Sequence, residues 1–178
     1  MRYPNESWAG IKRRAMAGEQ DCQYLYGCAL LSQDGHGNVD EARHWLEMAI
    51  CQGHADAMYE MASSYDSCEP AKALELLIKA AEMGSPAAEC DLGRRYEIEN
   101  GVPKDYAKAA FWYKKAADRD DGDAYASRKL GDFYESGTGV QQDWVAAARW
   151  YKAAADRYHK RYSKALCSLR EIRPWDDE

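Results

Sequence analysis

NGVPKDYAKAAFWYKKAAD, residues 100–118, and TGVQQDWVAAARWYKAAAD, residues 138–156, are two copies of one segment. They are identical at more than half of their positions, at a constant offset of 38 residues. Self-similarity at a period of about 20 to 50 residues is typical of solenoids, in which each repeat packs only against its neighbours. The two copies therefore predict a fold built from repeated helix pairs.

The repeat extends upstream of these copies. The LGxxY segment at residues 92–96 returns at residues 130–134, again 38 residues later. A full repeat is therefore a first helix with LGxxY, a loop with GV and a second helix with AxxWYxxAA. Gly93 gives the neighbouring helix room to approach closely, at a cost of about 1 kcal/mol in helix propensity.

The second helix of the repeat has the i, i+3, i+4, i+7 spacing of a buried stripe. In the copy at residues 100–118 the stripe consists of Ala109, Trp112, Tyr113 and Ala116. Asp105 and Asp143 directly precede the two second helices, and aspartate is favoured as an N-cap. We therefore expect these helices to begin after Asp105 and Asp143.

Weaker copies and half-repeats account for the rest of the chain. The N-terminal stretch predicts a lone second helix with Trp8, Ile11 and Ala15 on its inner face. Residues 157–172 predict a separate closing helix, because terminal units must cover an exposed edge of the core. The predicted single domain, residues 1–178, divides into an N-terminal capping helix at 8–20, repeats at 21–54, 55–86, 87–123 and 124–156, and a C-terminal capping helix at 157–172.

Composition limits the function. Of 178 residues, 46% are hydrophobic and 30% charged, and no apolar run approaches the roughly 20 residues of a membrane span. The N-terminus lacks the apolar stretch of a secretory signal, so we expect a cytoplasmic protein. The net charge of −6 disfavours nucleic acid and anionic membranes as partners and favours a basic protein.

The pattern LGxxYxxGxGVxxDxxxAxxWYxxAA resembles the consensus of the Sel-one-like repeat family, which is related to the tetratricopeptide repeat. Residues 130–155 fit every fixed position, and the preceding repeat fits nearly as well. The resemblance covers about residues 8–170. It implies an all-α fold, an α/α solenoid forming a right-handed superhelix, whose first helices line a concave face. It also implies an adaptor that holds proteins together without catalysis.

The related tetratricopeptide fold implies which side chains face the concave surface. Transferring its register selects acidic, basic and tyrosine side chains suited to a basic protein partner. The predicted partner-binding residues are Asp21, Tyr24, Asp56, Tyr59, Asp66, Arg94, Glu97, Tyr125, Arg128, Asp132 and Glu135. The alternative is that these residues are solvated faces of helices.

No set of residues predicts catalysis, a cofactor or a metal. The histidines, His36, His44, His54 and His159, do not form a ligand motif, and the Cys51–His54 pair lacks the four ligands of a structural zinc site. The six cysteines have irregular spacings and no CxxC pair, so we expect reduced thiols.

The sequence therefore predicts a non-enzymatic protein–protein interaction module, an adaptor that binds a basic partner such as a signalling protein. The alternative function is a bacterial immunity protein that neutralises a basic toxin. A small, acidic chain of repeats suits both functions, because electrostatic steering accelerates the binding of an oppositely charged partner. The oligomeric state is left open by the sequence.

Overall fold

The structure is a computed structural model that describes residues 7–32, 38–119 and 122–172, with side chains as far as residue 160. His36 and the side chain of Cys167 lie outside these residues. The described ranges contain helices and no strand, as the sequence predicted. The helices are α1 (Trp8–Met16), α2 (Gln20–Ser32), α3 (Val39–Cys51), α4 (Ala55–Tyr65), α5 (Pro70–Glu82), α6 (Pro86–Ile98), α7 (Tyr106–Ala117), α8 (Ala124–Ser136) and α9 (Trp144–Ile172).

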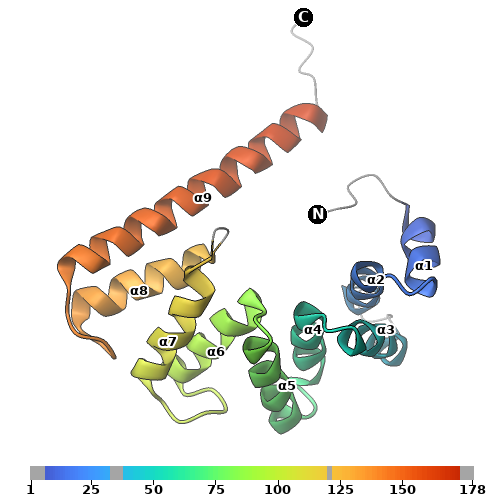
Figure 1. The fold of residues 1–178 in the computed structure, drawn as a ribbon, viewed down its shortest axis with the longest axis horizontal. Coiled ribbons are helices and arrows are strands. Elements are labelled where there is room, and N and C mark those ends of the chain that lie inside the picture. The colour runs from blue at the N-terminus through green and yellow to red at the C-terminus, as the bar shows by residue number, and fades with distance from the viewer. Residues whose placement is uncertain (1–6, 33–37, 120–121, 173–178) are drawn as a thin grey trace, which may run out of the picture. The chain divides into compact units, whose positions relative to one another are not determined.

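The chain separates into two compact units, Met1–Leu92 and Gly93–Glu178, with the boundary inside α6. In the first unit α1 packs on α2, and the antiparallel pairs α2/α3 and α4/α5 follow (Figure 1). In the second unit α7 packs on α8 and α8 on α9. The repeats are the helix pairs α2/α3, α4/α5, α6/α7 and α8/α9, and the fold is an all-α repeat solenoid. The assignment of residues 1–178 to a single domain stays a prediction.

The helix starts follow the sequence signals. The Asp105 carboxylate accepts a hydrogen bond from the Lys108 backbone nitrogen at 3.0 Å. The Asp143 carboxylate accepts from the backbone nitrogens of Val145 and Ala146 at 2.9 and 3.0 Å. Both N-cap predictions are confirmed. They satisfy amide groups that a helix leaves without partners at its N-terminus.

The apolar stripes form the core, with one exception in the predicted stripe of α7. Ala109, Tyr113 and Ala116 have no exposed surface, whereas Trp112 is only partly buried. A Cβ atom built on Gly93 would lie 2.9 Å from the Tyr113 ring, so the close approach predicted at Gly93 is confirmed.

Two expectations about the ends of the chain were wrong. Ile11 and Ala15 are buried, but Trp8 is 61% exposed. α9 runs without a break from Trp144 to Ile172, so residues 157–172 continue the second helix of the fourth repeat and do not form a separate closing helix (Figure 1). The reason lies in the sequence, because α3 and α5 end before Gly53 and Gly84, both at φ +89°, whereas residues 157–172 contain no glycine or proline.

Candidate functional site

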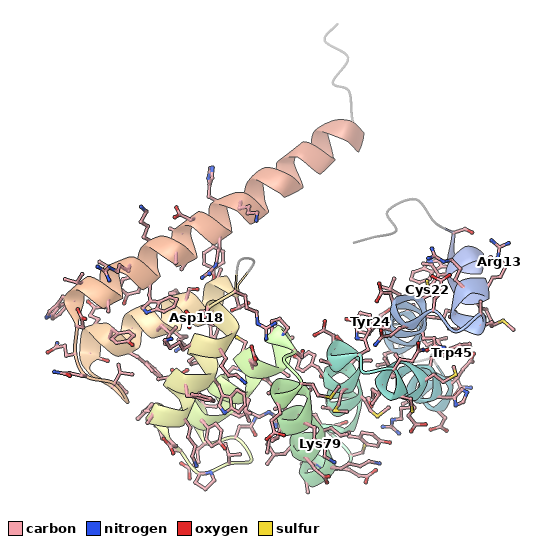
Figure 2. All side chains as sticks on the ribbon, in the orientation of Figure 1. Arg13, Cys22, Tyr24, Trp45, Lys79 and Asp118 are labelled. Atoms are coloured by element: carbon pink, nitrogen blue, oxygen red, sulfur yellow. The ribbon has the colours of Figure 1, made fainter. Side chains whose placement is uncertain are left out.

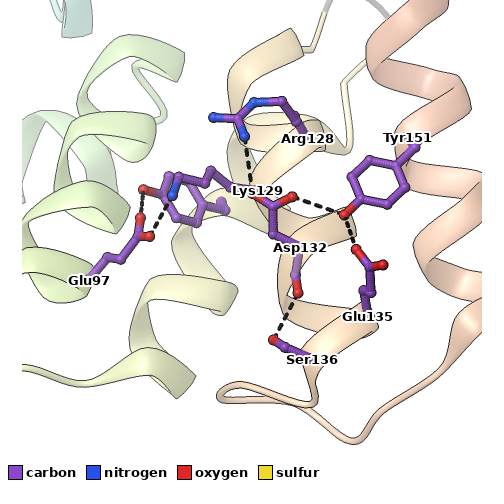
Figure 3. Close-up of polar contacts among 8 residues, drawn as sticks. Glu97, Arg128, Lys129, Asp132, Glu135, Ser136 and Tyr151 are labelled. Atoms are coloured by element: carbon purple, nitrogen blue, oxygen red, sulfur yellow. Dashed lines mark hydrogen bonds and ion pairs between the residues drawn. The ribbon is translucent and has the colours of Figure 1, made fainter.

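A polar network joins three helices of the second unit around Glu97 (Figure 3). The Tyr113 hydroxyl of α7 donates to the Glu97 carboxylate of α6 at 2.8 Å. The Lys129 ammonium of α8 donates to the same carboxylate at 2.5 Å. Only 16% of the Glu97 side chain and 18% of the Lys129 side chain are exposed. The charge of Glu97 is therefore neutralised within the protein.

A second group lies between α8 and α9. The Tyr151 hydroxyl lies 2.9 Å from an Asp132 oxygen and 2.6 Å from a Glu135 oxygen, and Arg128 donates to Asp132 at 3.1 Å (Figure 3). These bonds to Glu135 and Asp132, together with burial, raise the pKa of Tyr151 above its ordinary value. Tyr151 therefore stays protonated and can donate its single hydrogen to either carboxylate.

The two groups share one arrangement, in which a tyrosine of the second helix packs on a glycine of the first helix and its hydroxyl bonds to a carboxylate. In repeat 3 the ring of Tyr113 lies under Gly93, and its hydroxyl reaches Glu97 four residues further on. In repeat 4 a Cβ on Gly131 would lie 2.5 Å from the Tyr151 ring, and the hydroxyl reaches Glu135, again four residues after the glycine. The tyrosine thus fills the gap left by the glycine and ties the second helix to the first.

The first unit brings other predicted residues together around His54, which caps α4. The Tyr24 ring stacks on the His54 ring, with centroids 4.4 Å apart and an interplanar angle of 25°. Tyr24 lies on α2, as Figure 2 shows. His54 Nδ1 accepts from the Ala57 backbone nitrogen at 3.2 Å, and Nε2 lies 3.9 Å from an Asp21 oxygen. Since Nδ1 accepts a hydrogen bond, the proton of neutral His54 is on Nε2, facing Asp21.

Next to this stack lies a surface that we call the Glu60 patch, formed by Tyr24, Cys28, Asp56 and Glu60. The Ser85 hydroxyl donates to Asp56 at 2.6 Å. Burial, and then the Asp56 carboxylate one turn away, raise the pKa of Glu60 above its ordinary value. In the part of the chain that the structure describes, no lysine or arginine forms an ion pair with Asp56 or Glu60. The patch therefore holds negative charge that no lysine or arginine of the described residues neutralises.

The Glu60 patch is not suited to nucleophilic chemistry. Burial, and then the Glu60 charge, raise the pKa of the Cys28 thiol to about 12. Burial and the nearby Cys28 and Glu60 groups also raise the pKa of Tyr24. Both groups are protonated at neutral pH, and a thiol is a weak nucleophile in that form.

The remaining predicted residues are more scattered. Tyr59 is half-buried on α4, Asp66 is the exposed residue that follows α4, and Arg94 is exposed on α6. Tyr125 lies beneath two cations, with Arg128 at 5.3 Å and Lys129 at 5.8 Å from its ring centroid. The predicted residues form two sets, one in each unit, and their role in binding a partner stays a prediction.

Glu60, Lys129, the N-cap role of His54 and the hydrogen bonds of the Tyr113 and Tyr151 hydroxyls were not predicted from the sequence. Tyr113 was expected only as part of an apolar stripe. A buried tyrosine hydroxyl nearly always needs a hydrogen-bond partner, and an acidic residue four positions after each repeat glycine supplies one. This spacing could have revealed the two groups.

Within the described ranges no three His, Cys, Asp or Glu side chains are arranged to hold a metal ion. None of the helices described there is both long enough and apolar enough to span a membrane. Cys22, Cys28, Cys51, Cys68 and Cys90 are free thiols.

Four segments of the chain match the Sel1 repeat family, at residues 20–54, 55–85, 86–121 and 124–159. A stretch of 99 residues is 34% identical to chitin synthase regulatory factor 3 of Schizosaccharomyces pombe, covering 49% of this chain and 10% of that protein. The chain thus spans about one tenth of the curated relative that it matches.

Solved structures of repeat proteins are similar to this one. A Sel1 repeat protein from Oxalobacter formigenes is 30% identical with a TM-score of 0.74, over 91% of this chain and 48% of that one. A protective antigen with an SLR fold from uropathogenic Escherichia coli is 31% identical with a TM-score of 0.70, over 86% and 34%. A putative Sel1 repeat protein from Klebsiella pneumoniae subsp. pneumoniae is 26% identical with a TM-score of 0.61, over 85% and 74%.

Proposed function

The chain belongs to the Sel1 repeat family, and we propose that it is a non-enzymatic scaffold that binds a basic protein partner at the Glu60 patch. Sel1 repeat proteins are generally protein-interaction modules without catalysis of their own. Fold alone does not give function, so the proposal depends on the surface.

One observation favours the Glu60 patch over the other predicted residues as the binding site. Its negative charge has no cationic partner among the described residues. In the second unit Lys129 neutralises Glu97 and Arg128 pairs with Asp132. Glu60 stands two residues before Ala62, at the position that Lys129 occupies before Gly131 in repeat 4. Repeat 2 therefore has a carboxylate where repeat 4 has a cation, and we propose that lysine or arginine of the partner supplies the missing positive charge.

The half-buried tyrosine gives the patch a second binding element. Tyr24 is held by its stack on His54, so its ring loses little conformational freedom when a partner covers it. Rigid aromatic side chains next to complementary charge are typical of the residues that dominate binding energy. We expect binding in the cytoplasm, and a toxin neutralised by this chain is one partner with the required basic chemistry.

The test is affinity purification of the tagged chain from its native cells, followed by binding measurements with the purified partner. Substituting Glu60→Lys should weaken binding at least tenfold, or about 1.4 kcal/mol, because it reverses the charge that the partner meets. The fold should tolerate it, since the new lysine could pair with Asp56 one turn away. Affinity for the unsubstituted chain should fall with rising salt.

The matched control is Glu82→Lys, which makes the same change of charge at an exposed position on α5. It should leave the affinity nearly unchanged. Equal weakening by both substitutions would show that net charge alone attracts the partner, and no weakening by Glu60→Lys would exclude the Glu60 patch. A single stoichiometric partner that is toxic when expressed alone would identify the immunity function.

A further inference from the structure

The fourth repeat has an apolar surface that no later repeat covers in the described chain. Trp144 and Val145, in the first turn of α9, are 62% and 61% exposed. With Tyr134 and Val140 they line a groove of about 630 Å³ that we call the repeat-4 groove, completed by Gln141, Gln142 and Asp143. Because α9 continues straight to Ile172, it does not turn back to cover this groove.

The third repeat shows how the equivalent surface is covered. The Tyr106 ring packs edge-on against Phe133 of α8, with ring centroids 5.9 Å apart, and Val102 is only 9% exposed. Gly139 lies so close that a Cβ atom on it would be 2.4 Å from the Tyr106 carbonyl carbon. Tyr106 and Val102 correspond to Trp144 and Val140, so in repeat 3 this position is covered by α8 of the following repeat.

The repeat-4 groove has larger apolar side chains than the equivalent positions of repeat 3 at the start of the second helix. At the constant offset of 38 residues, Tyr106 becomes Trp144, Ala107 becomes Val145 and Lys104 becomes Gln142. Exposed apolar side chains that lie together on a surface are typical of a site that a partner covers.

The first unit offers a helix with the complementary chemistry. On α1, Trp8 and Met16 are 61% and 71% exposed, and together with Lys12 they follow the i, i+4, i+8 spacing of one helix face. α1 contains Lys12, Arg13 and Arg14 and no acidic residue, with Arg14 paired to Glu19. The residues that line the repeat-4 groove include an acidic side chain, Asp143, and no basic one.

We propose that α1 of one copy of this chain docks into the repeat-4 groove of a second copy. Trp8 and Met16 pack against Trp144 and Val145, and the basic side chains of α1 lie near Asp143. The contact is heterologous, because it joins two different surfaces, so each docked copy leaves one α1 and one groove free for further copies. The inference is independent of the proposed function, since it uses no residue of the Glu60 patch.

The test is sedimentation of the purified full chain from low micromolar to near-millimolar concentration. The weight-average mass should rise with concentration beyond twice the monomer mass. Trp8→Asp and Trp144→Asp should each be monomeric. Both positions are exposed and open a helix, where an acidic side chain is favourable, so the variants should fold.

The decisive sample is an equimolar mixture of the two variants. Trp8→Asp retains an intact groove and Trp144→Asp retains an intact α1, so the mixture should form one-to-one dimers and stop there. Phe111→Glu, which removes a 57% exposed aromatic from α7, is the control and should assemble like the unsubstituted chain. A monomer at every concentration, assembly that survives Trp144→Asp, or a mixture that stays monomeric would each overturn the proposal.

Discussion

The two units build the same helix pair with different core residues. Where repeats 3 and 4 place Tyr113 and Tyr151 on the second helix, repeats 1 and 2 place Leu46 and Leu77. The packing position is equivalent, since a Cβ on Gly27 would lie 2.9 Å from Leu46 and a Cβ on Gly93 would lie 2.9 Å from Tyr113. The difference is the hydroxyl, which ties α7 to a carboxylate on α6.

This difference extends to the surface charge. In the second unit the tyrosine hydroxyls and the cations Arg128 and Lys129 hold the carboxylates of the first helices. In the first unit the equivalent core residues are leucines, which have no hydroxyl to donate to a carboxylate. Asp56 and Glu60 have no cationic partner among the described residues. The acidic residues of a first helix can therefore be bonded within the protein, as in repeats 3 and 4, or be left without a cationic partner in the described chain, as Asp56 and Glu60 are in repeat 2.

The comparison is tested most strongly by moving the tyrosine into the first unit. Leu46→Tyr should destabilise the protein by about 3 kcal/mol, because it overpacks the core and buries a hydroxyl without a partner. The equivalent of Glu97 in repeat 1 is Leu31, which packs against the same core cluster as Leu46. Adding Leu31→Glu should return about 1 kcal/mol by supplying the acceptor. The measurement is chemical denaturation of the single and double variants.

The control for this prediction is Leu31→Glu alone. It should be destabilising, because it places a carboxylate on a partly buried apolar position. The double-mutant cycle then isolates the favourable coupling between the two new side chains. Strictly additive effects would contradict the view that the tyrosine and the carboxylate act as one device.

A smaller effect is expected from removing the hydroxyl where it occurs naturally. Tyr113→Phe should cost about 2 kcal/mol, since Tyr113 has no exposed surface and its hydroxyl donates to a charged acceptor. Tyr151→Phe is the matched variant and should cost less than about 1 kcal/mol, because Glu135 is exposed and water can replace the hydroxyl. Thermal unfolding of both variants would check the order, and a greater loss for Tyr151→Phe would contradict it.

Much of the fold could be predicted because each repeat contains residues that identify where its helices begin and pack. The glycine and tyrosine positions, the aspartate N-caps and the 38-residue offset all depend on local chemistry that the sequence shows directly. The course of α9 could not be predicted in the same way. The expectation of a separate closing helix came from the general need to cover a core edge, whereas residues 157–172 contain no local signal that ends a helix.

The candidate site was less predictable, because a helical register selects positions and not partners. It selected Glu97, Asp132 and Glu135 as binding residues, and the structure shows their oxygens accepting hydrogen bonds from within the second unit. It also passed over Glu60, whose environment depends on the burial and charge that neighbouring helices create. Such pairings depend on tertiary contacts that the sequence pattern does not contain.

The smallest predicted effect concerns the stability cost of keeping Glu60 unneutralised. Its pKa is raised, so the folded state binds the Glu60 proton more tightly than the unfolded state does. The contribution of Glu60 to the free energy of unfolding is therefore fully present below the ordinary glutamate pKa. It is lost as the pH rises through the raised pKa of the folded state. Glu60→Gln should stabilise the free protein at pH 7 by about 0.5 kcal/mol, the scale of like-charge repulsion across one helical turn. The gain should vanish in acid, as chemical denaturation across a pH series would show.

The control is Glu75, a glutamate in the same unit whose pKa is shifted in the opposite direction. Hydrogen bonding to Lys79, at 2.6 Å, lowers the pKa of Glu75, so its charge favours the folded state and Glu75→Gln should slightly reduce stability at pH 7. Opposite signs for two identical substitutions would show that the sequence places its unneutralised carboxylate selectively at the Glu60 patch. A loss of stability from Glu60→Gln at pH 7 would instead mean that the fold itself stabilises this charge, which would remove the reason for a basic partner to bind there.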